Sequence, residues 1–396
     1  MKPHRAILII AAALLLATPA RGMTVSYTHD AAGRLAGVNY GGTSSTAYAY
    51  DRNGNLLARA NSVNPFLSLA GRYSGLVLSA TPDGNNEGFI SIAVTRGGSF
   101  TGGLLLGAKR FLLTGMFDAN GDAAPIALAF AGLPAVQLDL HLDLATGALT
   151  GSVSGGITAT VSALASPYSA ARRAPGGFVG KFTALLDATE NVFTVPKGSG
   201  FALVTVKSSG AITMAGRLAD GTVISQGSAF IDTTRWPIFV WLYAKKGRIE
   251  GFVDFAADPG TGDCAGGLDW LKPATTGGRY AAGFATTVNF LGARYRPPAK
   301  RHRALDLFNV SPNAVITLDG APQDATLNTL NAIIVSPPNT DRLTLMLDPA
   351  TGLLTGSFRE GASRRILLGV LQQEANAGGG YFFSGAESLP FTLEAP

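Results

Sequence analysis

The sequence predicts an all-β protein: a short YD-type segment of tyrosine-containing hairpins followed by duplicated antiparallel β units of barrel-like or sandwich-like form. Three observations predict it. Apolar and polar residues alternate over segments of strand length, glycine supplies 50 of the 396 residues, and one strand–turn–strand sequence returns along the chain. Alternation with period two indicates a half-buried strand, and short strands separated by turn residues are typical of sandwiches and barrels.

The returning sequence spans residues 142–152, recurs almost unchanged at 347–357 and recurs more loosely at 242–252. Before the first copy, Leu138 and Leu140 share one face of a strand, while Asp139 and His141 share the other. Gly147 is expected to turn the chain with a positive φ. On the return strand, Gly151 leaves room for a side chain from across the core or permits a bend. The sequence therefore predicts a repeated hairpin in a curved sheet.

Residues 1–20 have the pattern of a signal peptide. Lys2 and Arg5 precede an apolar run at 6–17, and small residues follow at 18–20. We therefore expect an exported protein, secreted or held at the cell surface, with no transmembrane span once the leader is removed; an uncleaved anchor is the alternative. Without Lys2 and Arg5 the net charge of +5 falls to +3, which argues against a nucleic-acid partner. The single cysteine, Cys264, excludes an internal disulfide framework.

Two tyrosine repeats occupy residues 24–62. Residues 27–35 and 48–56 share a pattern of tyrosine, aspartate, glycine and leucine with a step of 21 residues. We expect each copy to form a hairpin in which the aspartate binds the turn amides and the glycine takes a positive φ. The residues that define the repeats are Tyr27, Asp30, Gly33, Tyr48, Tyr50, Asp51 and Gly54.

This segment, residues 25–59, resembles the YD repeat of the Rhs family, whose pattern is Tyr-x-Tyr-Asp-x-x-Gly-x-Leu. The second copy matches the pattern fully, and the first has His29 in place of the second tyrosine. The resemblance implies a protein of the cell surface or of a toxin-delivery assembly, since repeats of that family enclose toxins or line surface proteins that contact carbohydrate. Two copies cannot close a shell, so the segment is similar to the end of a longer repeat array.

Three β units are expected after the hairpins. Unit one spans 67–167, a linker spans 168–178, and unit two spans 179–293; residues 88–101 align with 200–213 without a gap, which indicates an internal duplication. A basic, proline-containing linker at 294–304 precedes a partial third unit at 305–396. Because the recurring hairpin returns in unit three, we expect units two and three to share one barrel.

The spacing of strands and the Thr-Gly-x-Phe rhythm are similar in style to the eight-stranded barrel lobes of bacterial surface proteins such as transferrin-binding-protein-like lipoproteins. That likeness favours barrels over sandwiches.

The candidate ligand-binding residues are Phe239, Trp241 and Tyr243, which replace the polar face of the recurring hairpin in unit two. Three aromatic side chains make a patch of roughly 450–750 Å². Soluble proteins seldom expose so much apolar surface in one place, so either a neighbouring unit or a ligand must cover it. Packing within the protein and a platform for sugars or a protein partner are the two interpretations.

The other candidate sites are polar. Asp118, Asn120 and Asp122 have the spacing of a calcium loop without its later ligands, and a simple turn is the alternative. No cofactor is expected. The chain lacks the sequence motifs of serine hydrolases, zinc proteases and phosphate loops. Carboxylates such as Glu87, Asp139, Glu250 and Asp254 could converge as in a glycosidase, although no spacing selects a pair.

The sequence thus predicts a non-enzymatic, exported structural or binding module. Its expected partners are surface glycans, with carbohydrate as the first ligand class, or other envelope proteins. One alternative is a purely architectural tail of a longer Rhs-type envelope or toxin-delivery protein, and the last is a hydrolase on a β-barrel.

Overall fold

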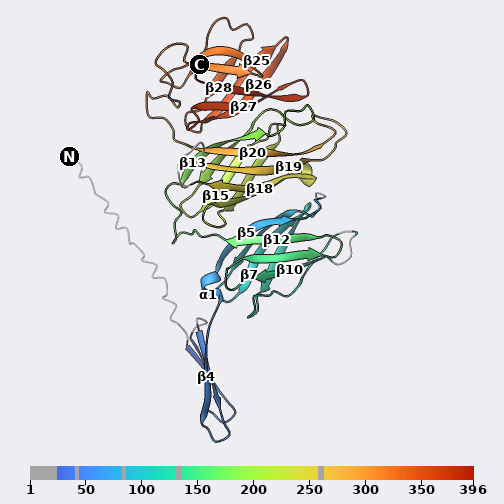
Figure 1. Cartoon of the computed structure of the whole chain (residues 1–396), viewed down its shortest axis with the longest axis vertical. Coiled ribbons are helices and arrows are strands. Elements are labelled where there is room, and N and C mark those ends of the chain that lie inside the picture. The colour runs from blue at the N-terminus through green and yellow to red at the C-terminus, as the bar shows by residue number, and fades with distance from the viewer. Residues whose placement is uncertain (1–24, 41–43, 83–85, 131, 133–135, 257–262) are drawn as a thin grey trace, which may run out of the picture. The chain divides into compact units, whose positions relative to one another are not determined.

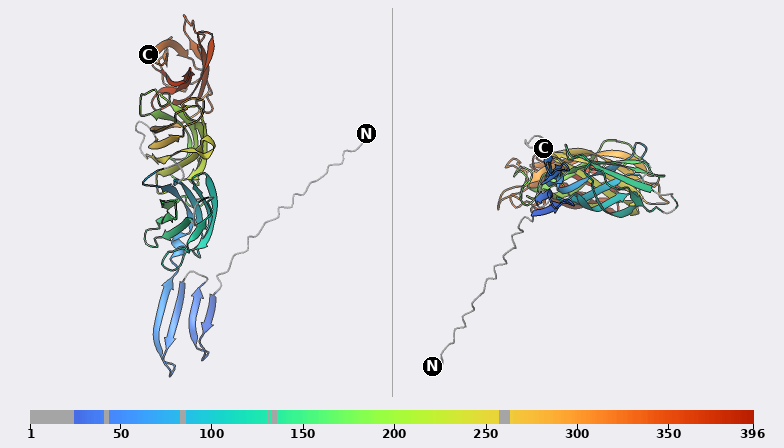
Figure 2. Two further views of the ribbon diagram at one scale, coloured as in Figure 1. Left: turned by 90° about the vertical axis from the view of Figure 1, so that its right-hand side faces the viewer. Right: turned by 90° about the horizontal axis from the view of Figure 1, so that it is seen from below.

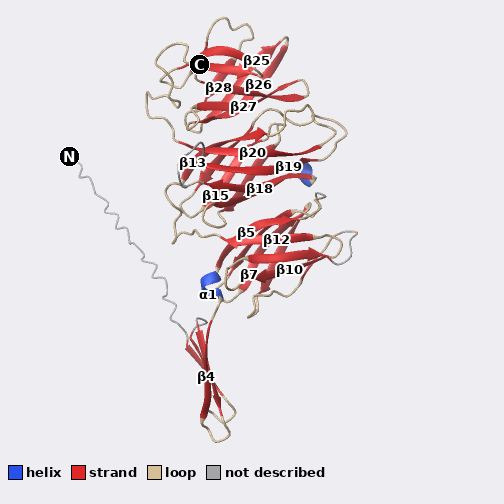
Figure 3. Cartoon of the chain, in the orientation of Figure 1, coloured by secondary structure: helices blue, strands red, loops and turns tan. Residues whose placement is uncertain are grey.

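The protein is described by a computed structural model that covers residues 25–40, 44–82, 86–130, 132, 136–256 and 263–396. The predicted signal peptide lies outside these residues. Within the described residues, regular structure is almost entirely strand (Figure 1, Figure 3), with one short helix, α1 (Phe66–Leu69), and one 3₁₀ turn at Tyr243–Lys245. The chain divides into two compact units, 1–67 and 68–396. The predicted all-β class is confirmed.

The first unit is a four-stranded antiparallel sheet in the order β1–β2–β3–β4. Its strands are β1 (Val25–His29), β2 (Leu35–Tyr40), β3 (Ser44–Tyr50) and β4 (Leu56–Val63). They form two hairpins, drawn in blue in Figure 2. Each hairpin has a register shift one residue before its aspartate, at Thr28/His29 and at Ala49/Tyr50. The two copies therefore share the same bend as well as the same sequence pattern.

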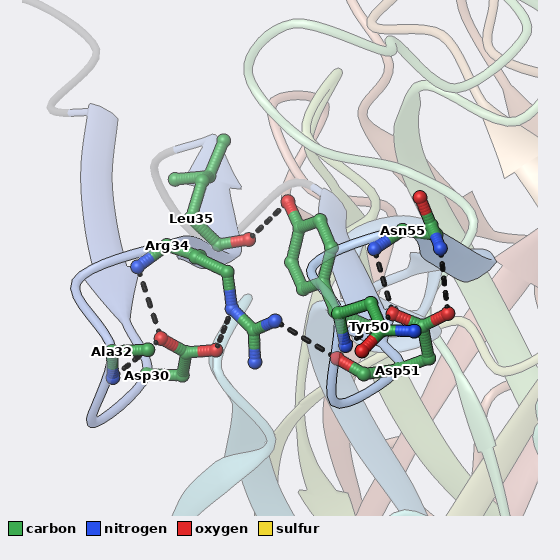
Figure 4. A network of polar contacts seen from close by, with 8 residues as sticks. Asp30, Ala32, Arg34, Leu35, Tyr50, Asp51 and Asn55 are labelled. Carbon is green, nitrogen blue, oxygen red and sulfur yellow. Dashed lines mark hydrogen bonds and ion pairs between the residues drawn. The ribbon is translucent and has the colours of Figure 1, made fainter.

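The turns of these hairpins use the predicted chemistry (Figure 4). The Asp30 carboxylate accepts the amides of Ala32 and Arg34, each at 2.9 Å, and the equivalent Asp51 accepts the amides of Asn53 and Asn55 at 2.9 and 2.8 Å. The Arg34 amide is the main cause of the lowered pKa of Asp30, and the pKa of Asp51 is lowered first by the Asn55 side chain, which donates to it at 2.8 Å, and then by the turn amides.

The glycines at the equivalent turn positions, Gly33 and Gly54, have φ of 76° and 92°. Only glycine adopts such values at little cost, which explains its place in both copies.

The second unit contains three eight-stranded antiparallel sheets, which we call barrels 1, 2 and 3. Barrel 1 contains β5 (Gly71–Leu78), β6 (Gly88–Val94), β7 (Ser99–Leu106), β8 (Lys109–Met116), β9 (Ile126–Leu128), β10 (Val136–Leu142), β11 (Leu149–Ser154) and β12 (Ala159–Ala165). Barrel 2 contains β13 (Gly180–Ala188), β14 (Gly200–Val206), β15 (Ala211–Arg217), β16 (Val223–Ala229), β17 (Arg235–Leu242), β18 (Gly247–Phe255), β19 (Cys264–Lys272) and β20 (Phe284–Tyr295). Barrel 3 contains β21 (Ala314–Leu318), β22 (Ala321–Leu327), β23 (Ile333–Val335), β24 (Thr344–Leu347), β25 (Leu353–Glu360), β26 (Ser363–Gln372), β27 (Ala377–Ser384) and β28 (Glu387–Glu394).

Each barrel is a meander whose first strand pairs with its last: β5 with β12, β13 with β20, and β21 with β28. One seam stays open in each sheet, between β8 and β9, between β16 and β17, and between β23 and β24. Side chains bridge the seams of barrels 1 and 2. Lys109 donates to the Ala129 carbonyl at 2.9 Å, and the Gln226 amide exchanges hydrogen bonds with Pro237 and Phe239.

The expectation that units two and three share a barrel is wrong. Barrel 2 closes on itself through the pairing of β13 with the 12-residue β20, and the third unit, expected to be partial, supplies eight strands of its own. The recurring hairpin misled this prediction because it does not hold one place in the barrels. It forms the sixth and seventh strands of barrel 1, the fifth and sixth of barrel 2, and the fourth and fifth of barrel 3.

Both expected linkers are partly built into barrel 2. Phe178, from the 168–178 segment, is buried in the barrel 2 core, and Tyr168 packs against that core. Arg294 and Tyr295, from the 294–304 segment, are the last residues of β20, and the Arg294 guanidinium donates to the carbonyls of Gly176, Gly177 and Val179. Phe178 and Arg294 therefore extend barrel 2 beyond the expected boundaries, while the Tyr295 ring is buried in the core of barrel 3.

The aliphatic faces lie inside the barrels, as the alternation predicts. Leu140, Ile238 and Leu345 are almost fully buried, and the half-buried Val240 packs against the core of barrel 2. Gly151, the inner glycine of the recurring hairpin, does not serve to leave room for a side chain from across the core. A Cβ at Gly151 would lie 2.3 Å from the Asp139 carbonyl oxygen. Glycine is required there because the neighbouring strand approaches too closely for any side chain.

We predict that Gly151→Ala destabilises barrel 1 by about 2–3 kcal/mol, because the neighbouring backbone must move away. Gly103→Ala is the matched control in the same barrel, since its Cβ would meet the Phe111 carbonyl oxygen at an ordinary 3.4 Å. Native-state hydrogen exchange of peptides from β10–β12 measures the difference. Equal protection in the two variants would contradict the explanation by close approach.

Candidate functional site

The predicted aromatic row does not form an exposed platform. Phe239 and Trp241 lie on the outward face of β17 with ring centroids 6.1 Å apart, but Phe239 is only 4% exposed and Trp241 is half-buried. The Lys245 ammonium lies 4.7 Å from the centroid of the Trp241 ring. Of the three candidate residues, only Trp241 offers part of a face to solvent on this strand, and a cation already occupies one side of it.

Tyr243 leaves the row because β17 ends at Leu242. In the other copies of the hairpin an aspartate, Asp143 or Asp348, stands at this position and accepts turn amides. Tyr243 cannot do this, and it takes a left-handed conformation with φ of 50°, as do the next two residues.

The Tyr243 ring packs against the barrel 2 core, and its hydroxyl donates to Asp220 at 2.6 Å and accepts from the Trp270 indole at 2.9 Å. Burial and the Asp220 charge raise the pKa of Tyr243. These contacts offset the strain of a left-handed turn that contains no glycine at its centre.

A buried ionic cluster covers the rest of this face. Strand pairing places Glu250 beside Phe239, and Arg248 beside Trp241. The Arg248 guanidinium donates to Glu250 at 2.6 Å and to Glu87 of barrel 1, which immediately precedes β6. The three side chains are 7%, 3% and 2% exposed, respectively. The sequence predicted that either a ligand or a neighbouring unit covers the aromatic face of this hairpin. The contact with Glu87 shows that barrel 1 covers part of that face.

The charges in this cluster do not balance, since one guanidinium faces two carboxyl groups. Burial raises the pKa of Glu250 above its ordinary value, and Asp269 on the adjacent strand adds to the rise, against the opposing effect of Arg248. The sequence named Glu87 and Glu250 among several acids without a reason to pair them. Arg248, which brings them together, carried no signal because the contact joins residues 161 positions apart.

A groove of about 1650 Å³ lies beside this cluster. It is lined by residues of β5–β7 in barrel 1, of β15 and β16 in barrel 2 and of the segment around Tyr168, and Phe239 also lines it. Hydroxyl groups, small side chains and backbone dominate the lining, with the half-buried rings of Phe89 and Tyr168. The charged residues that line it are three arginines and one aspartate: Arg72, Arg110, Arg172 and Asp232.

The weak calcium-loop candidate is a hydrogen-bonded turn. The Asp118 carboxylate accepts the amides of Asn120 and Asp122 at 2.8 and 2.9 Å, while the Asp122 carboxylate contacts His141 at 2.7 Å. Within the part of the chain that the structure describes, no three His, Cys, Asp or Glu side chains gather as metal ligands do. Cys264 is buried in the barrel 2 core, and this burial raises the pKa of its thiol.

Comparisons with known proteins identify no family. No family model matches the chain, and no curated protein matches it. Among solved structures, the WD40 domain of SCAP from fission yeast aligns with 94% of this chain and 74% of that chain, at 8% identity and a TM-score of 0.13. A score this low carries no argument about fold or function. None of the helices in the described ranges has the length and apolar character needed to cross a membrane.

The ionic cluster makes a prediction with two contrasting variants. Arg248→Met leaves two buried carboxyl groups without a cation, which should destabilise the junction of barrels 1 and 2 by about 3–5 kcal/mol. Glu250→Gln keeps an oxygen that can accept from Arg248 and removes the excess negative charge, so it should be no less stable than the wild type. Urea unfolding followed by tryptophan fluorescence measures both, and an equal loss in the two variants would refute this role for Arg248.

The same cluster predicts a dependence on pH. Because the pKa of Glu250 is higher in the folded protein than its ordinary value of 4.5, the stability it contributes is complete below that value and declines as pH rises through the folded pKa. The free energy of unfolding of the wild type should therefore fall as pH rises through the folded pKa of Glu250, while that of Glu250→Gln should not. Parallel curves for the two proteins in a pH series of urea unfolding experiments would contradict the prediction.

Proposed function

We propose that the chain is an exported, non-catalytic binding module and that it holds an acidic carbohydrate chain in the groove between barrels 1 and 2. The observation that carries the proposal is the lining of that groove. Hydroxyl and backbone groups can exchange hydrogen bonds with sugar hydroxyls, and the rings of Phe89 and Tyr168 offer apolar surface. The signal-peptide pattern and the YD-type repeats support an exported protein of the cell surface.

The charge of the groove favours acidic sugars. Three arginines of the groove are exposed: Arg72, Arg110 and Arg172. Arg248, by contrast, is buried and paired with two glutamates, so it cannot bind a ligand. Asp232 supplies the only opposing charge among the described lining residues. Planar guanidinium groups bind carboxylates and sulfates through paired hydrogen bonds. A polymer with uronic acid or sulfate groups therefore fits this lining better than a neutral one.

Hydrolysis is a weaker interpretation of the same region. Glu87 and Glu250 do converge, as a glycosidase would require, but Arg248 joins them and all three are buried. A hydrolytic pair needs room for the sugar and for water between or beside its carboxyl groups. The cluster is better suited to holding the two barrels together.

A purely architectural role is the second candidate, and the junction of barrels 2 and 3 favours it. Phe201, Val370 and Tyr381 are buried there in one apolar cluster. Gln372 donates to the carbonyls of Thr183 and Leu291 at 3.2 and 2.8 Å. Such a junction suits a spacer in a larger envelope or Rhs-type assembly, which would bind no small ligand.

Binding to a glycan array tests the proposal. We expect the protein to retain acidic polysaccharides, and we expect Arg72→Ala/Arg172→Ala to weaken this binding at least about tenfold, with less retention at high salt. Arg364→Ala, an exposed arginine of barrel 3, is the matched control. Trp241→Ala should bind as the wild type does, because Trp241 does not line the groove. Failure to retain any acidic glycan would leave the architectural role.

A further inference from the structure

The N-terminal sheet has little core of its own. In the described part of β1–β4, Val38 and Thr46 are the buried side chains, and all eight residues of β4 are exposed. Tyr27 and Leu57 are 61% and 68% exposed. A single sheet gains stability by covering a face or by pairing its edges, and a long flat edge strand is a template for another strand.

The contact between the two hairpins shows how another hairpin could bind. Strands β2 and β3 pair Gly37 with Ala47 and Val38 with Thr46. At the turn end, the Tyr50 hydroxyl of the second hairpin donates to the Leu35 carbonyl of the first at 2.9 Å.

Arg34 of the first hairpin completes this contact. Its guanidinium donates to the Asp51 carbonyl at 3.0 Å and lies 4.8 Å from the centroid of the Tyr50 ring (Figure 4). The interface thus combines main-chain pairing with two side-chain hydrogen bonds, one donated by each hairpin to a carbonyl of the other.

The 21-residue step of the repeat places counterparts of these groups at the two free edges. On the side of β4, Leu56 and Asn55 correspond to Leu35 and Arg34. On the side of β1, His29 and Asp30 correspond to Tyr50 and Asp51. An imidazole N–H at His29 can donate to a carbonyl as the Tyr50 hydroxyl does, and the Asn55 amide can donate as Arg34 does.

The same step fixes the register of the strands. Continuing the pairing of β2 with β3 sets Ala36 opposite Tyr48, and a shift of 21 residues sets Leu57 opposite Tyr27. These are two strongly exposed apolar side chains of the sheet. Pairing β4 of one copy with β1 of another would cover both and extend the antiparallel order without a break.

We propose that the N-terminal sheet binds a second copy of this chain, with β1 of one copy added to β4 of the next. The contact continues the interface already present between the two hairpins. It is heterologous, since β1 and β4 are different surfaces, and each added copy presents a new free β4 edge. Chains therefore associate head to tail into open arrays.

Sedimentation velocity of the full chain over a range of concentrations tests this proposal. The wild type is expected to show a mass that rises steadily beyond that of a dimer. Leu57→Lys and Tyr27→Lys should each weaken the association about tenfold or more, because a lysine on an edge strand opposes pairing. Combining Leu57→Lys with Tyr27→Glu should restore it. Leu112→Lys, at an 83% exposed position on the edge strand β8 of barrel 1, is the control.

Disulfide trapping tests the register directly. Residues opposite one another in an antiparallel pair lie close enough for a disulfide, and the native Cys264 is buried. A mixture of Tyr27→Cys and Leu57→Cys proteins should form a dimer linked between these positions under mild oxidation, while Tyr27→Cys mixed with Leu112→Cys should not. A wild type that stays a single chain at every concentration, association that stops at a dimer, or equal trapping in both mixtures would overturn the proposal.

Discussion

Closure of each eight-stranded meander by its own first and last strands is the constraint on which the structure depends. The pairs β5–β12, β13–β20 and β21–β28 join the two halves of each sheet, so each meander curls around an interior of its own with one seam left unpaired. Once a sheet curls around an interior, alternate residues must point inward, so the aliphatic side chains form the cores. At Gly151 the neighbouring strand approaches so closely that a Cβ would meet its backbone. The outward faces are then free to differ from barrel to barrel.

Those outward faces form the contacts between neighbouring barrels, and they also line the candidate site. On barrel 2, one part of the surface carries Arg248, which joins Glu250 to Glu87 of barrel 1. Another part meets barrel 3 through an apolar cluster that includes Phe201 and Tyr381. The arginine-lined groove belongs to the same set of surfaces. The three barrels thus share one type of aliphatic core but differ in the residues on their outward faces. We expect function to depend on the outward faces that differ.

The sequence predicted what depends on near neighbours in the chain. The alternation around Leu140 and Leu345 and the turn chemistry of Asp30 and Asp51 follow from local geometry, and the structure confirms both. Predictions that depend on distant partners were less successful. The pair β13–β20 joins residues at least a hundred positions apart, so units two and three were merged. The face of Phe239 was identified correctly, but alternation within one strand carries no information about which barrel covers it.

The separate closure of the barrels is tested most directly by removing barrel 3. A chain ending at residue 303 keeps every strand of barrels 1 and 2, and the buried Trp236 and Trp270 report on the interior of barrel 2. If each meander closes on itself, these indoles stay shielded from a soluble quencher and barrel 2 unfolds cooperatively. If barrel 2 instead needs strands from the third unit, both indoles will be accessible to the quencher and no cooperative transition will be seen.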